Sequence, residues 1–133
     1  MGSRDRDGRI SLLPSKLHMG ATITTRQQAA LERLIKIAQA DTGQSRRAAE
    51  FLLSWWNASN CGGFDLTTMW GVDMEIAADM VTVFTLVASC HRYPDDLGYG
   101  EEFRRIVHAW RPALQRDVET RTIDFHDTGL IHR

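Results

Sequence analysis

Apolar residues recur at helical spacing in four segments of the chain, and residues that favour turns separate these segments. The first segment spans residues 24–41. Its apolar residues are Ala30, Leu31, Leu34, Ile35 and Ala38. They share one face at 3.6 residues per turn, which predicts an amphipathic helix. Thr24 and Gln27 suit the N-cap and N3 positions of a capping box, and Gly43 suits the break that follows the helix.

The second segment, from residue 45 to about residue 57, is apolar on most of its sides. Its apolar residues are Ala48, Ala49, Phe51, Leu52, Leu53, Trp55 and Trp56. A helix of this kind packs against neighbours on more than one side, so we expect it at the centre of the fold. Ser45 is the expected N-cap. Asn, Ser and Gly-Gly in the stretch 57–63 favour the loop that ends the helix.

The third segment, residues 73–91, is the longest apolar run of the chain. Asp73 is expected to cap it, and Asp65 to cap a short helical turn over residues 66–70. The buried face is predicted to hold Ile76, Ala77, Met80, Val81, Phe84, Val87 and Ala88. Residues 81–87 are rich in β-formers, but the run is too long for a typical strand and contains no breaker. We therefore predict a helix.

The fourth segment, residues 101–110, follows a loop that contains Pro and Gly. Its predicted buried residues are Phe103, Ile106, Val107 and Trp110. Its acidic residues precede its arginines, as the helix dipole favours, and Arg111-Pro112 ends it. The four segments together predict an all-α fold, a compact bundle of four main helices plus a short helical turn.

The chain has 133 residues, and 43% of them are hydrophobic, which is enough for one domain with a core. We expect a single helical domain over residues 24–112, between a flexible basic N-terminal arm (1–23) and a flexible polar C-terminal tail (113–133). No apolar run has the roughly 18 residues that a membrane span needs, and the N-terminus lacks the apolar region of a signal peptide. Cys61 and Cys90 are therefore expected to be reduced thiols in a cytoplasmic protein.

Charge is distributed unevenly along the chain, although the net charge is −1. Residues 51–102 carry one basic and eight acidic residues, whereas residues 1–50 carry nine basic and five acidic residues. An acidic region repels nucleic-acid phosphates and attracts basic protein surfaces. Acidic residues also favour helix N-termini, so the same residues are compatible with solvated helix ends.

Patterns specific to an enzyme or a metal protein are missing from the sequence. Cys90 and His91 are adjacent, and adjacent helical residues point about 100° apart, so adjacency does not make them a catalytic dyad. The ligand spacings of structural zinc sites and EF-hands do not occur. The acids that follow Gly98 and Gly100 would repel an anion at that helix start. We therefore expect no catalytic residue, no cofactor and no bound metal.

Three of the four tryptophans lie between Phe51 and Trp70. Trp55 or Trp56 is expected to pack against Trp70 or Trp110 in the core. Adjacent tryptophans point in different directions, so one of the pair is expected to be partly exposed and to anchor a partner.

Eight residues are candidates for binding a partner. They are Trp55, Trp56, Asn57, Asn60, Asp65, Asp79, Asp95 and Asp96. Among them Asp79 is expected to face away from the apolar stripe. Reversing its charge should then weaken binding of a basic partner and leave the fold intact.

Two runs, LLSWWNASNCGGFDLTTMWGVD and RYPDDLGYGEEFRRIVHAWRP, resemble a small uncharacterised protein family. Its members are similar to short reading frames of bacterial plasmids and integrative conjugative elements, described as a domain of unknown function. The resemblance covers about residues 45–112. It implies a bacterial mobile-element setting and supplies no activity, cofactor or catalytic residue. Some small helical proteins of this setting resemble anti-CRISPR proteins, which inhibit host defence.

The sequence therefore favours a non-enzymatic protein-binding protein of a mobile genetic element. The expected partner is a protein, in the most specific form a basic, CRISPR-type nucleic-acid-handling complex that this protein inhibits. The alternative is a DNA-binding transcriptional or plasmid-maintenance regulator that uses basic terminal regions, with Arg104, Arg105 and Arg111 on a phosphate-binding face. No membrane partner is expected, and the oligomeric state is left open.

Overall fold

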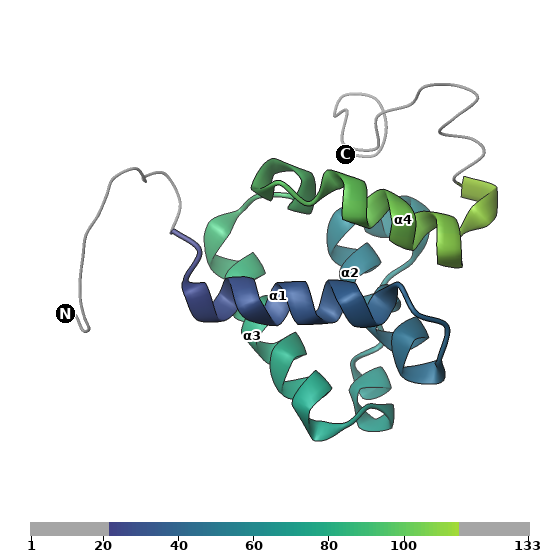
Figure 1. Cartoon of the computed structure of the whole chain (residues 1–133), viewed down its shortest axis with the longest axis horizontal. Helices are drawn as coiled ribbons and strands as arrows, with labels where there is room; N and C mark the ends of the chain where they lie inside the picture. Colours follow the sequence, from purple (N-terminus) through teal and green to yellow (C-terminus); the bar gives the residue numbers. More distant parts are fainter. Residues whose placement is uncertain (1–21, 115–133) are drawn as a thin grey trace.

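Figure 1 shows the computed structural model, which describes residues 22–114. Its α-helices are α1 (Thr25–Ala38), α2 (Gly43–Cys61), α3 (Met74–Cys90) and α4 (Gly100–Trp110). Two short 3-10 helices join them, η2 (Leu66–Gly71) and η3 (Pro94–Leu97). None of residues 22–114 forms a strand, so the all-α prediction of four main helices and a short turn is confirmed. The predicted arm and tail lie almost wholly outside the described residues.

Local hydrogen bonds define where the first two helices begin. The capping box of α1 is confirmed, because Thr24 Oγ1 accepts from Gln27 N at 3.0 Å and Gln27 Oε1 accepts from Thr24 N at 3.1 Å. The cap predicted for α2 is wrong. Thr42 is the N-cap, and its hydroxyl accepts from the backbone N of Ser45 at 3.0 Å. Ser45 lies one turn inside the helix and is buried. The prediction placed the cap too late because the apolar pattern begins after the helix itself does.

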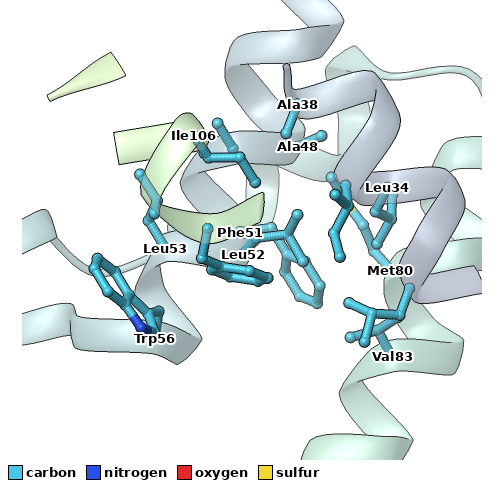
Figure 2. Packing of buried hydrophobic residues seen from close by; sticks show 14 of the residues in the cluster. Leu34, Ala38, Ala48, Phe51, Leu52, Leu53, Trp56, Met80, Val83 and Ile106 are labelled. Atoms are coloured by element: carbon cyan, nitrogen blue, oxygen red, sulfur yellow. The ribbon is translucent and has the colours of Figure 1, made fainter. Parts of the chain in front are cut away.

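Helices α1 and α2 hold the bundle together. In Figure 1, α1 crosses the middle of the molecule between α4 on one side and α3 on the other. The helix α2 contacts α1, α3, α4 and η2, which confirms its predicted central place. Figure 2 shows Leu34 of α1 with Met80 and Val83 of α3 on one side of the core, and Leu53 and Trp56 of α2 on the other.

The helix predicted over residues 73–91 is confirmed as α3, but its buried face differs from the prediction. The buried residues are Ile76, Met80, Val83, Leu86 and Cys90. Val81 and Phe84, which were expected in the core, are 55% and 60% exposed. Helix α3 is apolar on two sides, and a periodic pattern does not say which of the two sides meets the other helices.

Helix α4 closes the bundle through its C-terminal end. Phe103, Ile106 and Val107 are buried as predicted, whereas Trp110 is half-buried. The indole N–H of Trp110 donates to the carbonyl oxygen of Ala38 at 2.7 Å. Arg111 caps the helix and donates from Nε to the carbonyl oxygen of Cys61 at 3.1 Å. These two bonds tie the end of α4 to the ends of α1 and α2.

An ion pair with two hydrogen bonds links α1 to α3. Arg33 Nε and Nη2 each donate to one carboxylate oxygen of Asp79, both at 2.9 Å. The side chain of Asp79 is only 13% exposed. The expectation that Asp79 faces away from the apolar stripe is therefore wrong, because Asp79 lies on the packed side of α3, against Arg33 of α1.

The Asp79→Lys variant is expected to melt at a lower temperature than the parent protein. The substitution removes both hydrogen bonds and places a second cation beside Arg33. The double variant Arg33→Glu/Asp79→Lys restores opposite charges, so it should recover part of the loss. Thermal melting followed by circular dichroism tests this, and losses in the two single variants that simply add in the double variant would contradict it.

Candidate protein-binding surface

The two adjacent tryptophans are part of the packing between α2 and α4. The ring of Trp55 lies 6.2 Å from the ring of Phe103 and that of Trp56 lies 6.3 Å from it. Trp55 is half-buried and donates from its indole to the carbonyl oxygen of Arg92 at 3.0 Å. Trp56 is buried, so it cannot act as the exposed anchor in the folded protein. Packing on Trp70 or Trp110 was expected, and Trp70 is excluded as a partner because its side chain is 84% exposed.

Asn57 breaks the regular course of α2. Its backbone has φ −165° and ψ 81°, outside the helical region, and its side chain is buried. Its side-chain oxygen accepts from the backbone N of Asn60 at 3.2 Å, so Asn57 starts a new turn. Asn60 is exposed on this last turn. Asn57 thus shapes the helix end and offers little surface to a partner.

The four acidic candidates do not gather at one place. Asp65 precedes η2, Asp79 lies midway along α3, and Asp95 and Asp96 lie in η3. Helix α3 separates η2 from η3 along the chain, and its 17 residues span about 25 Å. The eight residues predicted from the sequence therefore do not form a single contact site.

The large apolar side chains that stay exposed among the described residues are a different set. They are Leu66 (65% exposed), Trp70 (84%), Met74 (83%), Val81 (55%) and Phe84 (60%). They belong to η2 and to the outer side of α3, and we call them the η2–α3 surface. The sequence contained one signal of this surface. The sequence of α3 is apolar on two sides, whereas a helix that packs on the core with one side needs only one apolar side. The second apolar side is therefore available to form a surface.

The segment that carries Trp70 is capped by Asp65 at its start and tied to α2 just after its end. Before η2, the carboxylate of Asp65 accepts from the backbone N of Thr67 at 3.0 Å and from its hydroxyl at 2.8 Å. After η2, Gln44 of α2 accepts from the backbone N of Asp73 at 2.6 Å and donates to its carboxylate at 3.2 Å. Trp70 is therefore exposed on a backbone segment that hydrogen bonds hold in place, so binding a partner would cost little backbone ordering there.

Gly71 allows one further contact at the end of η2. A Cβ atom at this position would lie 2.7 Å from Nε of Arg47, which is closer than van der Waals contact allows. The guanidinium of Arg47 therefore lies directly against the backbone beside Trp70. Arg47 also donates from Nη1 to the carbonyl oxygen of Gly43 at 3.3 Å. Its side chain therefore contacts both Gly43 and Gly71.

Acidic side chains flank the η2 end of this surface along the chain. Asp65, Asp73 and Glu75 are all exposed. The hydrogen bonds from Thr67, first from its hydroxyl and then from its backbone N, hold the pKa of Asp65 below its usual value. This carboxylate is therefore ionised at neutral pH. The η2–α3 surface thus combines exposed apolar groups with negative charge at one end.

The shallow groove between α1 and α4 is a weaker candidate for a binding site than the η2–α3 surface. It measures about 320 Å³ and is lined in part by Glu32, Lys36 and Tyr99. The hydroxyl of Tyr99 donates to Glu32 at 2.7 Å, and burial together with this bond raises the pKa of Tyr99. Glu32 and Tyr99 thus already bind one another.

Among the described residues, Cys61 is not an activated thiol, and no cluster of side chains forms a metal centre. Burial raises the pKa of Cys61 to about 11, so this thiol is protonated at neutral pH. Within residues 22–114 no group of three His, Cys, Asp or Glu side chains could hold a metal ion. None of the helices described in this range is long and apolar enough to cross a membrane.

The sequence of residues 28–111 matches the model of a family of unknown function, DUF7673. The chain belongs to the DUF7673 family. The region shared with DUF7673 begins in the first turn of α1 and ends one residue after α4, so it contains the whole η2–α3 surface. No curated protein and no solved structure matches the chain.

Proposed function

We propose that this protein acts by binding another protein and not by catalysis, with Trp70 as the anchor of the contact. The observation that carries the proposal is the 84% exposure of Trp70 on a segment that Asp65 caps at its start and Gln44 ties to α2 after its end. Tryptophan is enriched among the residues that dominate binding energy at protein interfaces. Leu66 and Met74 are also exposed and extend the apolar area on either side of it along the chain.

The charge near Trp70 supports a basic partner. Asp65, Asp73 and Glu75 flank it in the sequence and outnumber Arg47, whose guanidinium lies beside it, and residues 51–102 carry eight acidic residues against one basic residue. Opposite charge on a partner would raise the rate of association and exclude acidic competitors. A basic surface that normally binds nucleic acid has this property.

In its more specific form, the proposal is that this protein belongs to a bacterial mobile genetic element and inhibits a CRISPR-type, nucleic-acid-handling defence complex. Its support is the sequence resemblance over residues 45–112 together with the acidic region. The target would lose access to nucleic acid because this protein covers its basic surface.

A DNA-binding regulator has less support among the described residues, because Arg104, Arg105 and Arg111 already bind groups of this protein. Arg104 and Arg105 pair with Glu101 at 3.4 Å and 3.9 Å. Arg111 donates to two backbone carbonyl oxygens. A phosphate would have to displace these partners.

The Trp70→Ala variant is expected to bind the partner at least tenfold more weakly than the parent protein, which corresponds to about 1.4 kcal/mol. Its melting temperature should not change, because the side chain is almost fully exposed. The measurement is the affinity of the full chain for purified basic nucleic-acid-handling complexes, and thermal melting is recorded beside it.

His108→Ala is the matched control, since His108 is exposed on α4. It should bind like the parent protein. Unchanged affinity of the Trp70→Ala variant would refute the proposed anchor. Tight binding of duplex DNA that weakens steeply with salt would instead favour the regulator.

A further inference from the structure

The outer side of α3 carries an uncharged stripe along its whole length. The six positions spaced three, four and seven residues on either side of Val81 share one side of the helix with it. The stripe thus consists of Met74, Ala77, Ala78, Val81, Phe84, Thr85 and Ala88. Ala77 is half-buried and the other six are exposed. The stripe lies on the opposite side of α3 from its buried residues, and nothing in residues 22–114 covers it.

A second copy of the stripe, rotated by 180° about an axis at Val81, is complementary to the first. The position of Phe84 then meets that of Ala78, and the position of Met74 meets that of Ala88. Each pair joins a large side chain with a small one, which is how facing helices interdigitate without gaps. Thr85 meets Ala77 in the same way, and Val81 meets its own copy.

We propose that the stripe binds a second copy of this chain, with the two α3 helices antiparallel and a two-fold axis at Val81. The inference rests on the proposed binding role of the η2–α3 surface and assigns the α3 part of it to self-association. An interface of this kind is isologous, because the same patch of both copies forms it. Trp70 and Leu66 lie beyond the paired helices, so the dimer would present two anchors to other partners.

The area of the stripe is sufficient for a modest dimer. A fully exposed Phe side chain offers on the order of 200 Å². At the exposed fractions given above, Met74, Val81 and Phe84 present on the order of 400 Å² per copy. With the smaller side chains of the stripe, the pair would bury on the order of 1,000 Å², the lower limit for a biological interface. This area predicts a dimer that dissociates on dilution.

Charge at the ends of α3 selects the antiparallel arrangement. Asp73 and Glu75 lie at the start of the helix, and a parallel pair would place each beside its own copy. The antiparallel pair instead places these acids near the opposite end of the partner helix, where His91 is exposed. Helix dipoles also favour antiparallel neighbours, since opposite ends then lie together. The Arg33–Asp79 ion pair connects α3 to α1, away from the stripe, so dimerisation leaves it intact.

Sedimentation equilibrium of the full chain over a wide range of concentration tests the dimer. The parent protein is expected to reach twice the mass of one chain at high concentration. Ala78→Glu puts a carboxylate where Phe84 of the partner packs, so it should raise the dissociation constant of the dimer at least tenfold. Ala109→Glu makes the same change at an exposed position of α4 and should leave the dimer unchanged.

Cysteine substitution tests the position of the axis. Val81→Cys should form an intermolecular disulfide under mild oxidation, because the two copies of this residue meet. Phe84→Cys should not, because its copies lie about 9 Å apart along the helices at 1.5 Å per residue, and a disulfide needs Cα atoms within roughly 7 Å. Equal cross-linking of both variants would overturn the antiparallel pairing.

A parent protein that stays monomeric at every concentration would overturn the inference as a whole. That result would leave the proposed function standing, because the Trp70→Ala variant tests it in a separate binding measurement. Conversely, a dimer whose Trp70→Ala variant still binds its target would refute the anchor and keep the self-association.

Discussion

The Phe103→Ala variant is expected to lose about 3–5 kcal/mol of the free energy of unfolding, the usual cost of removing a buried aromatic ring. Phe103 has no exposed surface, and the rings of Trp55 and Trp56 both pack against it. Truncation leaves a cavity between α2 and α4 that these two large rings cannot readily fill. Because single domains are stable by only about 5–15 kcal/mol, the variant should be close to unfolding at body temperature. Urea denaturation followed by tryptophan fluorescence measures the loss.

Two further variants show whether burial is the cause. Phe103→Leu keeps much of the apolar volume and should cost clearly less than the alanine variant. Phe84→Ala removes the same ring from an exposed position and should change stability by no more than about 0.5 kcal/mol, measured in dilute protein where no dimer forms. Similar losses at Phe84 and Phe103 would contradict the packing of α4 described above.

The free energy of unfolding is expected to fall by up to about 2 kcal/mol as the pH rises from 9 to about 11, through the Cys61 thiol alone. Burial raises the pKa of this thiol from 9.0 to about 11 in the folded protein, and the nearby charge of Arg111 offsets only part of the effect. In that range the unfolded chain has lost the thiol proton and the folded chain still holds it. The unfolded state then binds fewer protons, so stability must decrease with rising pH.

Comparison with the Cys61→Ala variant isolates this contribution from other groups that titrate at high pH. The variant should show a shallower decline of stability between pH 9 and 11, whatever its stability at neutral pH. Denaturant unfolding at several pH values in reducing buffer gives both curves. Parallel curves for the two proteins would mean that Cys61 is ionised as easily in the folded state as in the unfolded chain.

The helices of this protein follow from features that are local in the sequence. The Thr24–Gln27 capping box needs only residues three apart, and it forms as the sequence predicts. The apolar spacing of residues 30–38 and 103–107 likewise places the buried faces of α1 and α4 correctly. In both helices only one side is apolar, so there is one way to bury it.

The sequence predicted the candidate site less well, because exposure depends on which elements meet. Trp56 and Trp70 are the same residue type, yet one is buried against α4 and the other is 84% exposed. The difference arises from contacts between residues far apart in the chain, such as the one between Trp56 and Phe103. Asp79 shows the same effect, since its partner Arg33 is 46 residues away. No local pattern encodes such pairs.

Local patterns of the sequence thus establish four helices, the acidic character of residues 51–102 and one capping box. Only the tertiary structure shows which side of α3 meets α1 and α2, and therefore that Val81 and Phe84 remain on the outside. The physical reason is that helix periodicity depends on neighbours three and four residues away, whereas burial depends on the packing of whole helices. When a helix is apolar on two sides, both sides fit the sequence pattern, and the shape and volume of the surrounding side chains choose between them.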